Sequence, residues 1–192
     1  MPSIANDLRE SIYPECEITI NEPPTYLSIR NSKRENELMS VKIKIEGLTR
    51  ENFVAFELEK IKNKNNTALI KIDWINKRTD GIIYTYYENT HKFMIIEVKT
   101  QAPKGCESQF KSMHSFLCYL TKALELNNKL ANNSEKIELS KVLISRRVNK
   151  NYINPRKVLF NDKINANEIC YKSNEKDSIP IQELLDCKFM KI

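Results

Sequence analysis

The chain has 192 residues and a formal net charge of +6 at pH 7, and this length suits one domain whose core needs neither disulfides nor a structural metal. The basic balance permits binding to a polyanion but does not require it. Only three glycines occur, so the glycine-rich loops of nucleotide-binding folds are absent, and no apolar run reaches the roughly 18 residues of a membrane span.

The first part of the chain predicts short strands and one helix. Residues 1–39 form an irregular N-terminal extension that several prolines interrupt. From Ser40 to Glu46 apolar and polar residues alternate, which predicts a half-buried strand. Gly47 ends this pattern, and the apolar spacing from about residue 50 to 62 predicts a helix.

Three strands are predicted next, and the last two form an antiparallel hairpin. The apolar runs at 68–75, 82–87 and 93–100 are strand signals, and Glu88 to His91 supplies the turn. After the hairpin, the 3.6-residue apolar period predicts a long helix that ends at about Asn127.

Residues 141–145 (KVLIS) predict a further buried strand. Weaker signals indicate strands at 157–160 and 168–171 and a short helix at 181–185. The order of elements predicts an α/β, or α+β, fold in which helices flank a central mixed β-sheet. We expect a single domain over residues 1–192, with its core at about 40–145 and an accessory region at 146–192.

Two opposite charges share one face of the second hairpin strand. Side chains alternate along a strand, so Glu97 and Lys99 project from the same side. If a two-residue turn, either Glu88-Asn89 or Asn89-Thr90, closes the hairpin, Asp80 lies opposite Glu97 or Lys99. In both registers two carboxylates and one amine share a face.

Adjacent carboxylates repel each other unless a proton or a cation lies between them, and oxygen ligands suit Mg²⁺ or Mn²⁺. Metal-assisted phosphodiester hydrolysis also uses a nearby cation that orients the attacking water or offsets developing charge. Lys99 is placed for that role. The structural alternative is a cross-strand salt bridge on an exposed sheet edge, worth about 0 to 1 kcal/mol.

The motif Asp80-Gly81-Ile82-Ile83, followed by a hairpin, by Ile95-Ile96-Glu97-Val98-Lys99-Thr100 and by a long helix, resembles the PD-(D/E)XK nuclease superfamily. The resemblance covers about residues 50–145 and implies a restriction-endonuclease-like fold. Thr79 stands where members of the family often have a proline.

The resemblance implies a metal-binding set and a catalytic cation. Asp80, Glu97 and the backbone carbonyl of Val98 would bind Mg²⁺ or Mn²⁺, and Lys99 would be the catalytic lysine. These residues belong to the motif itself, so they are transferred position by position.

Many members of the family add a glutamate from the first core helix. Glu57 and Glu59 are the candidates, and Glu57 is preferred as a fourth catalytic and metal-binding residue because it lies among apolar residues of the predicted helix. Asp73 is a weaker rival for the first carboxylate.

Four further residues are candidates for contact with nucleic acid. Gln109, with Lys111 beside it, takes the place of a glutamine that some members carry on the long helix, although Met113 replaces the tyrosine of one branch. Arg146 and Arg147 begin the densest basic region, which is either a solvated loop or a segment that binds phosphate.

The sequence therefore predicts a metal-dependent nuclease that acts on DNA or RNA, as an endonuclease rather than an exonuclease. The alternative is an inactive restriction-endonuclease-like domain that binds nucleic acid or another protein. Many enzymes of this fold cut as dimers, so a homodimer is a further expectation. Five scattered cysteines without a CxxC pair predict reduced thiols in a cytoplasmic protein with no membrane partner.

Overall fold

The structure is a computed structural model that describes residues 4–12, 14–18, 20, 26–30, 40–58, 79–99, 106–127, 136–145, 169–173, 178–187 and 190–191. The strands are β1 (Tyr26–Arg30), β2 (Ser40–Lys44), β3 (Phe53–Phe56), β4 (Gly81–Tyr87), β5 (Thr90–Lys99), β6 (Lys136–Ser145), β7 (Ile169–Ser173), β8 (Ile179–Pro180) and β9 (Met190–Lys191). The helices are α1 (Ile4–Ser11), the short 3-10 helix η1 (Pro14–Cys16), α3 (Cys106–Leu126) and α4 (Ile181–Leu185).

Two mixed sheets organise these elements. Within the described residues, six strands form the larger sheet in the order β3-β4-β5-β6-β7, with β9 also paired to β6. Strands β3, β4 and β5 are antiparallel neighbours, whereas β5, β6 and β7 run parallel. In the smaller sheet, β2 pairs antiparallel with β1 and parallel with β8. The fold is therefore α+β, which confirms the predicted mixed sheet.

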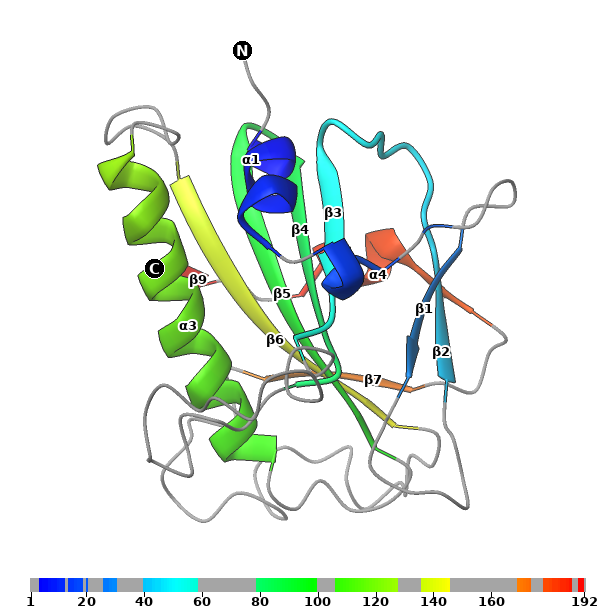
Figure 1. Cartoon of the computed structure of the whole chain (residues 1–192). Coiled ribbons are helices and arrows are strands. Elements are labelled where there is room, and N and C mark those ends of the chain that lie inside the picture. Colours follow the sequence, from blue (N-terminus) through cyan, green and yellow to red (C-terminus); the bar gives the residue numbers. More distant parts are fainter. Residues whose placement is uncertain are drawn as a thin grey trace.

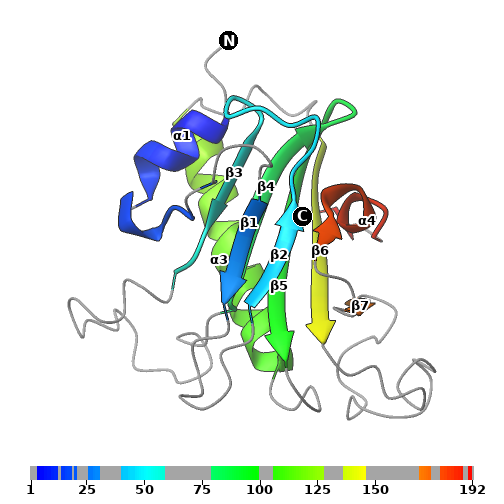
Figure 2. The ribbon, with the colours of Figure 1, turned by 90° about the vertical axis from the view of Figure 1, so that its right-hand side faces the viewer.

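Each face of the larger sheet is covered by a different layer (Figures 1 and 2). Helices α1 and α3 cover one face, which we call the helix face, through side chains that include Leu8 and Phe110. The smaller sheet and α4 cover the opposite face through side chains that include Leu27 and Leu184. The strand residues on the helix face are Val54, Phe56, Ile82, Tyr84, Phe93, Ile95, Leu139 and Leu143.

The predicted hairpin is confirmed, and its register is the first of the two that the sequence allowed. Tyr87 pairs with Thr90 across the two-residue turn Glu88-Asn89, and the ladder continues to Gly81 opposite Ile96. Both turn residues have positive φ angles, 50° and 55°, as two-residue turns of type I′ require to match the twist of their strands.

Several other predicted elements are confirmed. The alternating segment at residue 40 is β2, the long helix is α3, the signal at 168–171 is β7, and the short helix at 181–185 is α4. Strand β6 begins at Lys136, earlier than the apolar run at 141–145 suggested.

The helix predicted at about 50–62 is wrong in the part that the structure describes. Residues 53–56 form strand β3, and all four are buried. A short apolar run that is buried on both faces lacks the alternation that distinguishes a strand from a helix. Here the run is a strand because it pairs with β4 along its whole length. The predicted strands at 68–75 and 157–160 lie outside the described residues.

Segments beyond residues 40–145 also contribute to the core. In the N-terminal region, α1 buries Ile4, Ala5 and Leu8. Near the C-terminus, β7 and β9 pair with β6, and β8 pairs with β2. The core is therefore wider than the predicted range, because both terminal regions complete sheets or cover one.

Cys187 is disulfide-bonded, so the expectation that all five cysteines are reduced thiols is wrong for this residue. Cys16, Cys106 and Cys118 are free thiols. Within the described part of the chain, no helix is both long enough and apolar enough to cross a membrane.

Candidate functional site

The predicted acidic and basic residues meet where the β4–β5 hairpin ends. Continuing the register by one pair beyond Gly81 and Ile96 places Asp80 opposite Glu97. Both residues, and Lys99, follow the alternation of the side chains that pack against α3, so all three belong to the helix face. The structure thus brings together the three charges that the sequence placed on one face.

The two carboxylates are buried and the amine lies at the boundary with solvent. Asp80 is 2% exposed and Glu97 is 0% exposed, while the Lys99 side chain retains 17% of its exposure. Buried charges are costly unless they are paired. Lys99 forms an ion pair with Glu97, and its Nζ also donates to Oε1 of Gln109 at 3.3 Å.

Asp80 is held by the backbone of the neighbouring strand. Its Oδ2 accepts a 2.7 Å hydrogen bond from the N–H of Val98. Strand β4 begins at Gly81, so its backbone pairs with β5 only as far as Ile96. A buried backbone N–H needs an acceptor, and the Asp80 side chain supplies it beyond the end of the ladder.

Of the four residues predicted to contact nucleic acid, two lie on α3, and they differ in burial. Gln109 is 3% exposed and reaches Lys99, whereas Lys111 is exposed. Only Gln109 therefore joins the charged cluster. Arg146 and Arg147 lie outside the described residues.

Glu57 directly follows β3 instead of lying on a helix. Its backbone N–H donates to the carbonyl of Cys16 at 2.7 Å. In β3, Val54 and Phe56 lie on the helix face, so strand alternation gives Glu57 to the opposite face from Asp80. The geometry does not favour Glu57 as a ligand, and the other candidate, Glu59, lies outside the described residues.

The oxygen donors at this position suit a divalent ion with few protein ligands. Among the residues that the structure describes, no group of three or more His, Cys, Asp or Glu side chains could hold a metal ion. Mg²⁺, however, commonly uses one or two carboxylates and takes its other ligands from water and substrate phosphate. Asp80, Glu97 and the Val98 carbonyl are hard oxygen donors of this kind, so the residues present fit Mg²⁺ or Mn²⁺.

Sequence reasoning missed two buried polar residues near the cluster. Lys141 on β6 is 6% exposed and Ser112 on α3 is 3% exposed. Lys141 opens an apolar run that predicts a buried strand, and this context was the signal that the lysine itself would be buried. His91, expected in the turn, lies in β5 and shares a 2.8 Å hydrogen bond with the hydroxyl of Tyr84.

Comparison with protein-family models, with curated proteins and with solved structures found no match.

Proposed function

We propose that this chain is a nuclease of restriction-endonuclease-like fold that hydrolyses phosphodiester bonds of DNA or RNA with Mg²⁺ or Mn²⁺. The observation that carries the proposal is the opposition of two buried carboxylates, Asp80 and Glu97, across the hairpin, with Lys99 at the solvent boundary. A hydrophobic sheet accommodates like charges side by side only when a cation offsets them.

Each residue of the cluster has a distinct role in this proposal. Asp80, Glu97 and the Val98 carbonyl would hold the divalent ion, which when bound polarises a phosphate oxygen and lowers the pKa of a water molecule. The Lys99 ammonium orients the attacking water or offsets charge that develops on the phosphate. Gln109 restricts the positions of that ammonium by accepting its hydrogen bond.

The charge of the whole chain supports a nucleic-acid substrate. A net charge of +6 favours association with a polyanion through release of counterions. Cleavage within the strand and assembly as a homodimer remain parts of the proposal that rest on the resemblance of the motif, and action in the cytoplasm rests on the scattered cysteines of the sequence.

The second candidate function is an inactive domain that binds nucleic acid or protein. The observation that favours it is that each carboxylate has a partner within the fold: Glu97 forms an ion pair with Lys99, and Asp80 accepts the Val98 N–H. A cluster with a purely structural role would show the same contacts.

Cleavage of a supercoiled plasmid and of single-stranded RNA in the presence of Mn²⁺ separates the two functions. We expect cleavage of one substrate by the wild type and a loss of about 100-fold or more in Glu97→Gln and Lys99→Met. Matched controls are Glu138→Gln and Lys92→Met, since these residues pair across β5 and β6 on the opposite face of the sheet. Circular dichroism confirms that each variant is folded.

Three results count against the nuclease. Full cleavage by folded Glu97→Gln or Lys99→Met would remove the proposed site. Equal losses in the control pair would show that the effect is not specific to this cluster. A wild-type protein that binds nucleic acid but cleaves neither substrate would support the inactive domain.

A further inference from the structure

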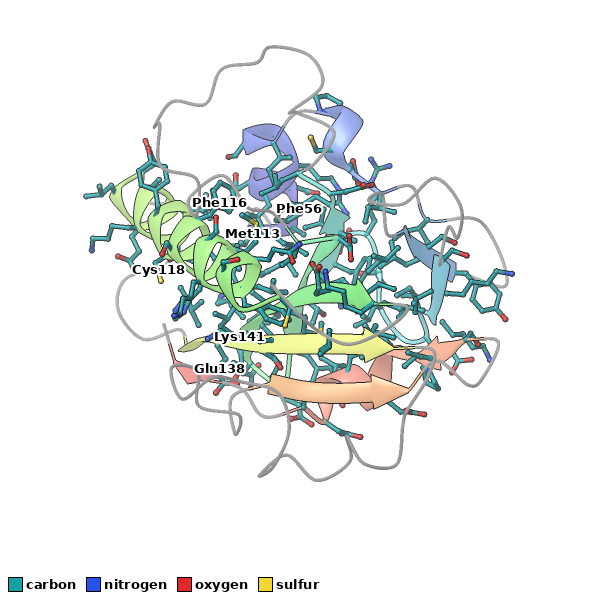
Figure 3. All side chains as sticks on the ribbon, turned by 90° about the horizontal axis from the view of Figure 1, so that it is seen from below. Phe56, Met113, Phe116, Cys118, Glu138 and Lys141 are labelled. Atoms are coloured by element: carbon teal, nitrogen blue, oxygen red, sulfur yellow. The ribbon has the colours of Figure 1, made fainter. Side chains whose placement is uncertain are left out.

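Lys141 is a buried lysine on the same sheet face as the charged cluster. It is 6% exposed, and its neighbours at two positions on either side, Leu139 and Leu143, pack against α3. Strand alternation therefore places Lys141 on the helix face. Figure 3 shows Lys141 on β6 together with Met113 and Phe116 of α3.

A buried ammonium requires an anionic or strongly polar environment. Among the described acidic residues, Asp80 and Glu97 belong to the helix face of the larger sheet. Glu138 lies three residues before Lys141, so it projects from the opposite side of β6. Asp7 is buried on α1, and α1 packs against β3 at the far edge of the sheet.

The parallel register makes Glu97 the nearer of the two carboxylates. Lys141 pairs with Ile95, and Glu97 pairs with Leu143. Lys141 and Glu97 are therefore diagonal neighbours on adjacent strands, and the strand spacing and rise put their Cα atoms about 8 Å apart. The flexible four-carbon stem of lysine spans such a distance. Asp80 lies one strand further away, on β4.

Two buried polar side chains of α3 also belong to the surroundings of the charged cluster. Gln109 and Ser112 are both buried and lie three residues apart, which places them on one side of the helix. Gln109 contacts Lys99. Most of the other buried side chains of this helix are apolar, and they include Phe110, Met113 and Leu117; the buried Thr121 lies further along the helix. The polar environment of the cluster is thus continued along α3 by Ser112.

We propose that Lys141 is a second cation of the cluster, whose charge offsets that of the Glu97 carboxylate when no metal ion is bound. Two carboxylates, Asp80 and Glu97, and two amines, Lys99 and Lys141, give a buried group with no net charge. In this arrangement Lys141 stabilises the ionised Glu97 carboxylate from the β6 side, while Lys99 approaches it from the solvent boundary. The effect of Lys141 on a divalent ion rests on the proposed function, whereas its coupling to Glu97 does not.

A double-mutant cycle in the absence of metal tests the coupling. Denaturant midpoints are measured for the wild type, Lys141→Met, Glu97→Gln and the double variant. We expect the midpoint shift caused by Lys141→Met to fall to about half or less in the Glu97→Gln background. Lys122→Met, an exposed lysine on α3, is the control and should be additive with Glu97→Gln.

Additive shifts for Lys141→Met and Glu97→Gln would overturn the proposal. If Lys141→Met alone does not fold, recovery of a cooperative transition in the double variant supports the coupling, and failure of the double variant to fold overturns it. If Lys141 only fills space in the core, the midpoint shift caused by Lys141→Met will not depend on whether Glu97 is present.

Binding of Mn²⁺, measured by electron paramagnetic resonance, is a second test, because the proposal predicts the direction in which Lys141→Met changes the affinity. Removing one positive charge near two carboxylates should tighten Mn²⁺ binding several-fold in Lys141→Met, with no change in Lys122→Met. Weaker or unchanged binding by folded Lys141→Met would contradict the proposal. A wild type that binds no Mn²⁺ would refute the metal site of the proposed function, while the double-mutant cycle still decides the role of Lys141.

Discussion

The carboxylate of Asp80 accepts a 2.7 Å hydrogen bond from the backbone N–H of Val98, the residue between Glu97 and Lys99. Through this bond the side chain that precedes β4 is fixed to the end of β5. The contact completes the backbone pairing of the sheet, and it also holds one carboxylate beside the other. The structural role of Asp80 depends on its ability to accept a hydrogen bond, whereas its proposed chemical role depends on its negative charge. Substitutions can separate these two properties.

Asp80→Asn and Asp80→Ala should differ in stability. The asparagine keeps a side-chain oxygen that accepts the Val98 N–H, whereas alanine leaves this buried donor unsatisfied at a cost of about 1 to 3 kcal/mol. Chemical denaturation should show a loss of this size for alanine and a much smaller loss for asparagine. Both variants should lose Mn²⁺ binding, because neither retains the charge of the carboxylate.

Equal stability of the two variants would show that the hydrogen bond to Val98 contributes little. Tight Mn²⁺ binding by Asp80→Asn would show that Asp80 is not a ligand.

Gln109→Met should reduce cleavage without changing the affinity for Mn²⁺. The glutamine accepts a hydrogen bond from Lys99 and is not itself a proposed ligand, so its loss should misplace the ammonium while Asp80, Glu97 and the Val98 carbonyl are unchanged. We expect kcat to fall about tenfold or more. Steady-state cleavage and Mn²⁺ titration on the same samples check the two quantities.

Lys111→Met is the matched control for Gln109→Met, because Lys111 is exposed on the same helix. A drop in kcat for Lys111→Met as large as that for Gln109→Met would point to a general effect on substrate binding. An unchanged rate in Gln109→Met would remove the positioning role.

The Glu88-Asn89 turn should be improved by the sequence Asn-Gly. Both residues have positive φ angles, and glutamate adopts this region at a cost that asparagine and glycine largely avoid. Glu88→Asn combined with Asn89→Gly should raise the unfolding free energy by about 0.5 to 2 kcal/mol. Glu88→Gln, which removes the charge but not the backbone cost, should show little gain in the same denaturation experiment.

The hairpin, unlike β3, was predictable because its pattern left few alternatives. Turn residues between two apolar runs restricted the register to two choices, and in both of them Asp80, Glu97 and Lys99 share one face. The alternation of side chains along the two strands was therefore enough to predict that these three residues lie together. The choice between the two registers depended on which pair of residues adopts positive φ angles, and the sequence does not state this.

The failed helix at 50–62 and the missed Lys141 have a common physical cause. Both concern the middle of the sheet, where tertiary pairing outweighs local pattern. Residues 53–56 are buried on both faces, so they carry no period that identifies a strand. Lys141 is buried because β5, β7 and α3 surround β6, and the apolar run that it opens is only a weak local signal of this.

Gly81 lies directly after Asp80 and under the smaller sheet, so its substitution tests how closely the two sheets approach. A Cβ added at Gly81 would lie 3.0 Å from Cδ1 of Ile29 on β1. We expect Gly81→Ala to cost about 1 to 3 kcal/mol through overpacking. Ile29→Val removes the Cδ1 atom and alone costs about 0.5 to 1.5 kcal/mol.

Because the two changes relieve one contact, Gly81→Ala with Ile29→Val should cost less than the sum of the single variants. Gly47→Ala provides the contrast: Gly47 has a φ of 71° and nothing within 4 Å of an added Cβ, so its cost arises from the backbone and Ile29→Val should not reduce it. Denaturation of the five variants measures these differences. Additivity for the Gly81 and Ile29 pair would show that the smaller sheet shifts away without cost, and that its packing does not constrain the start of β4 next to Asp80.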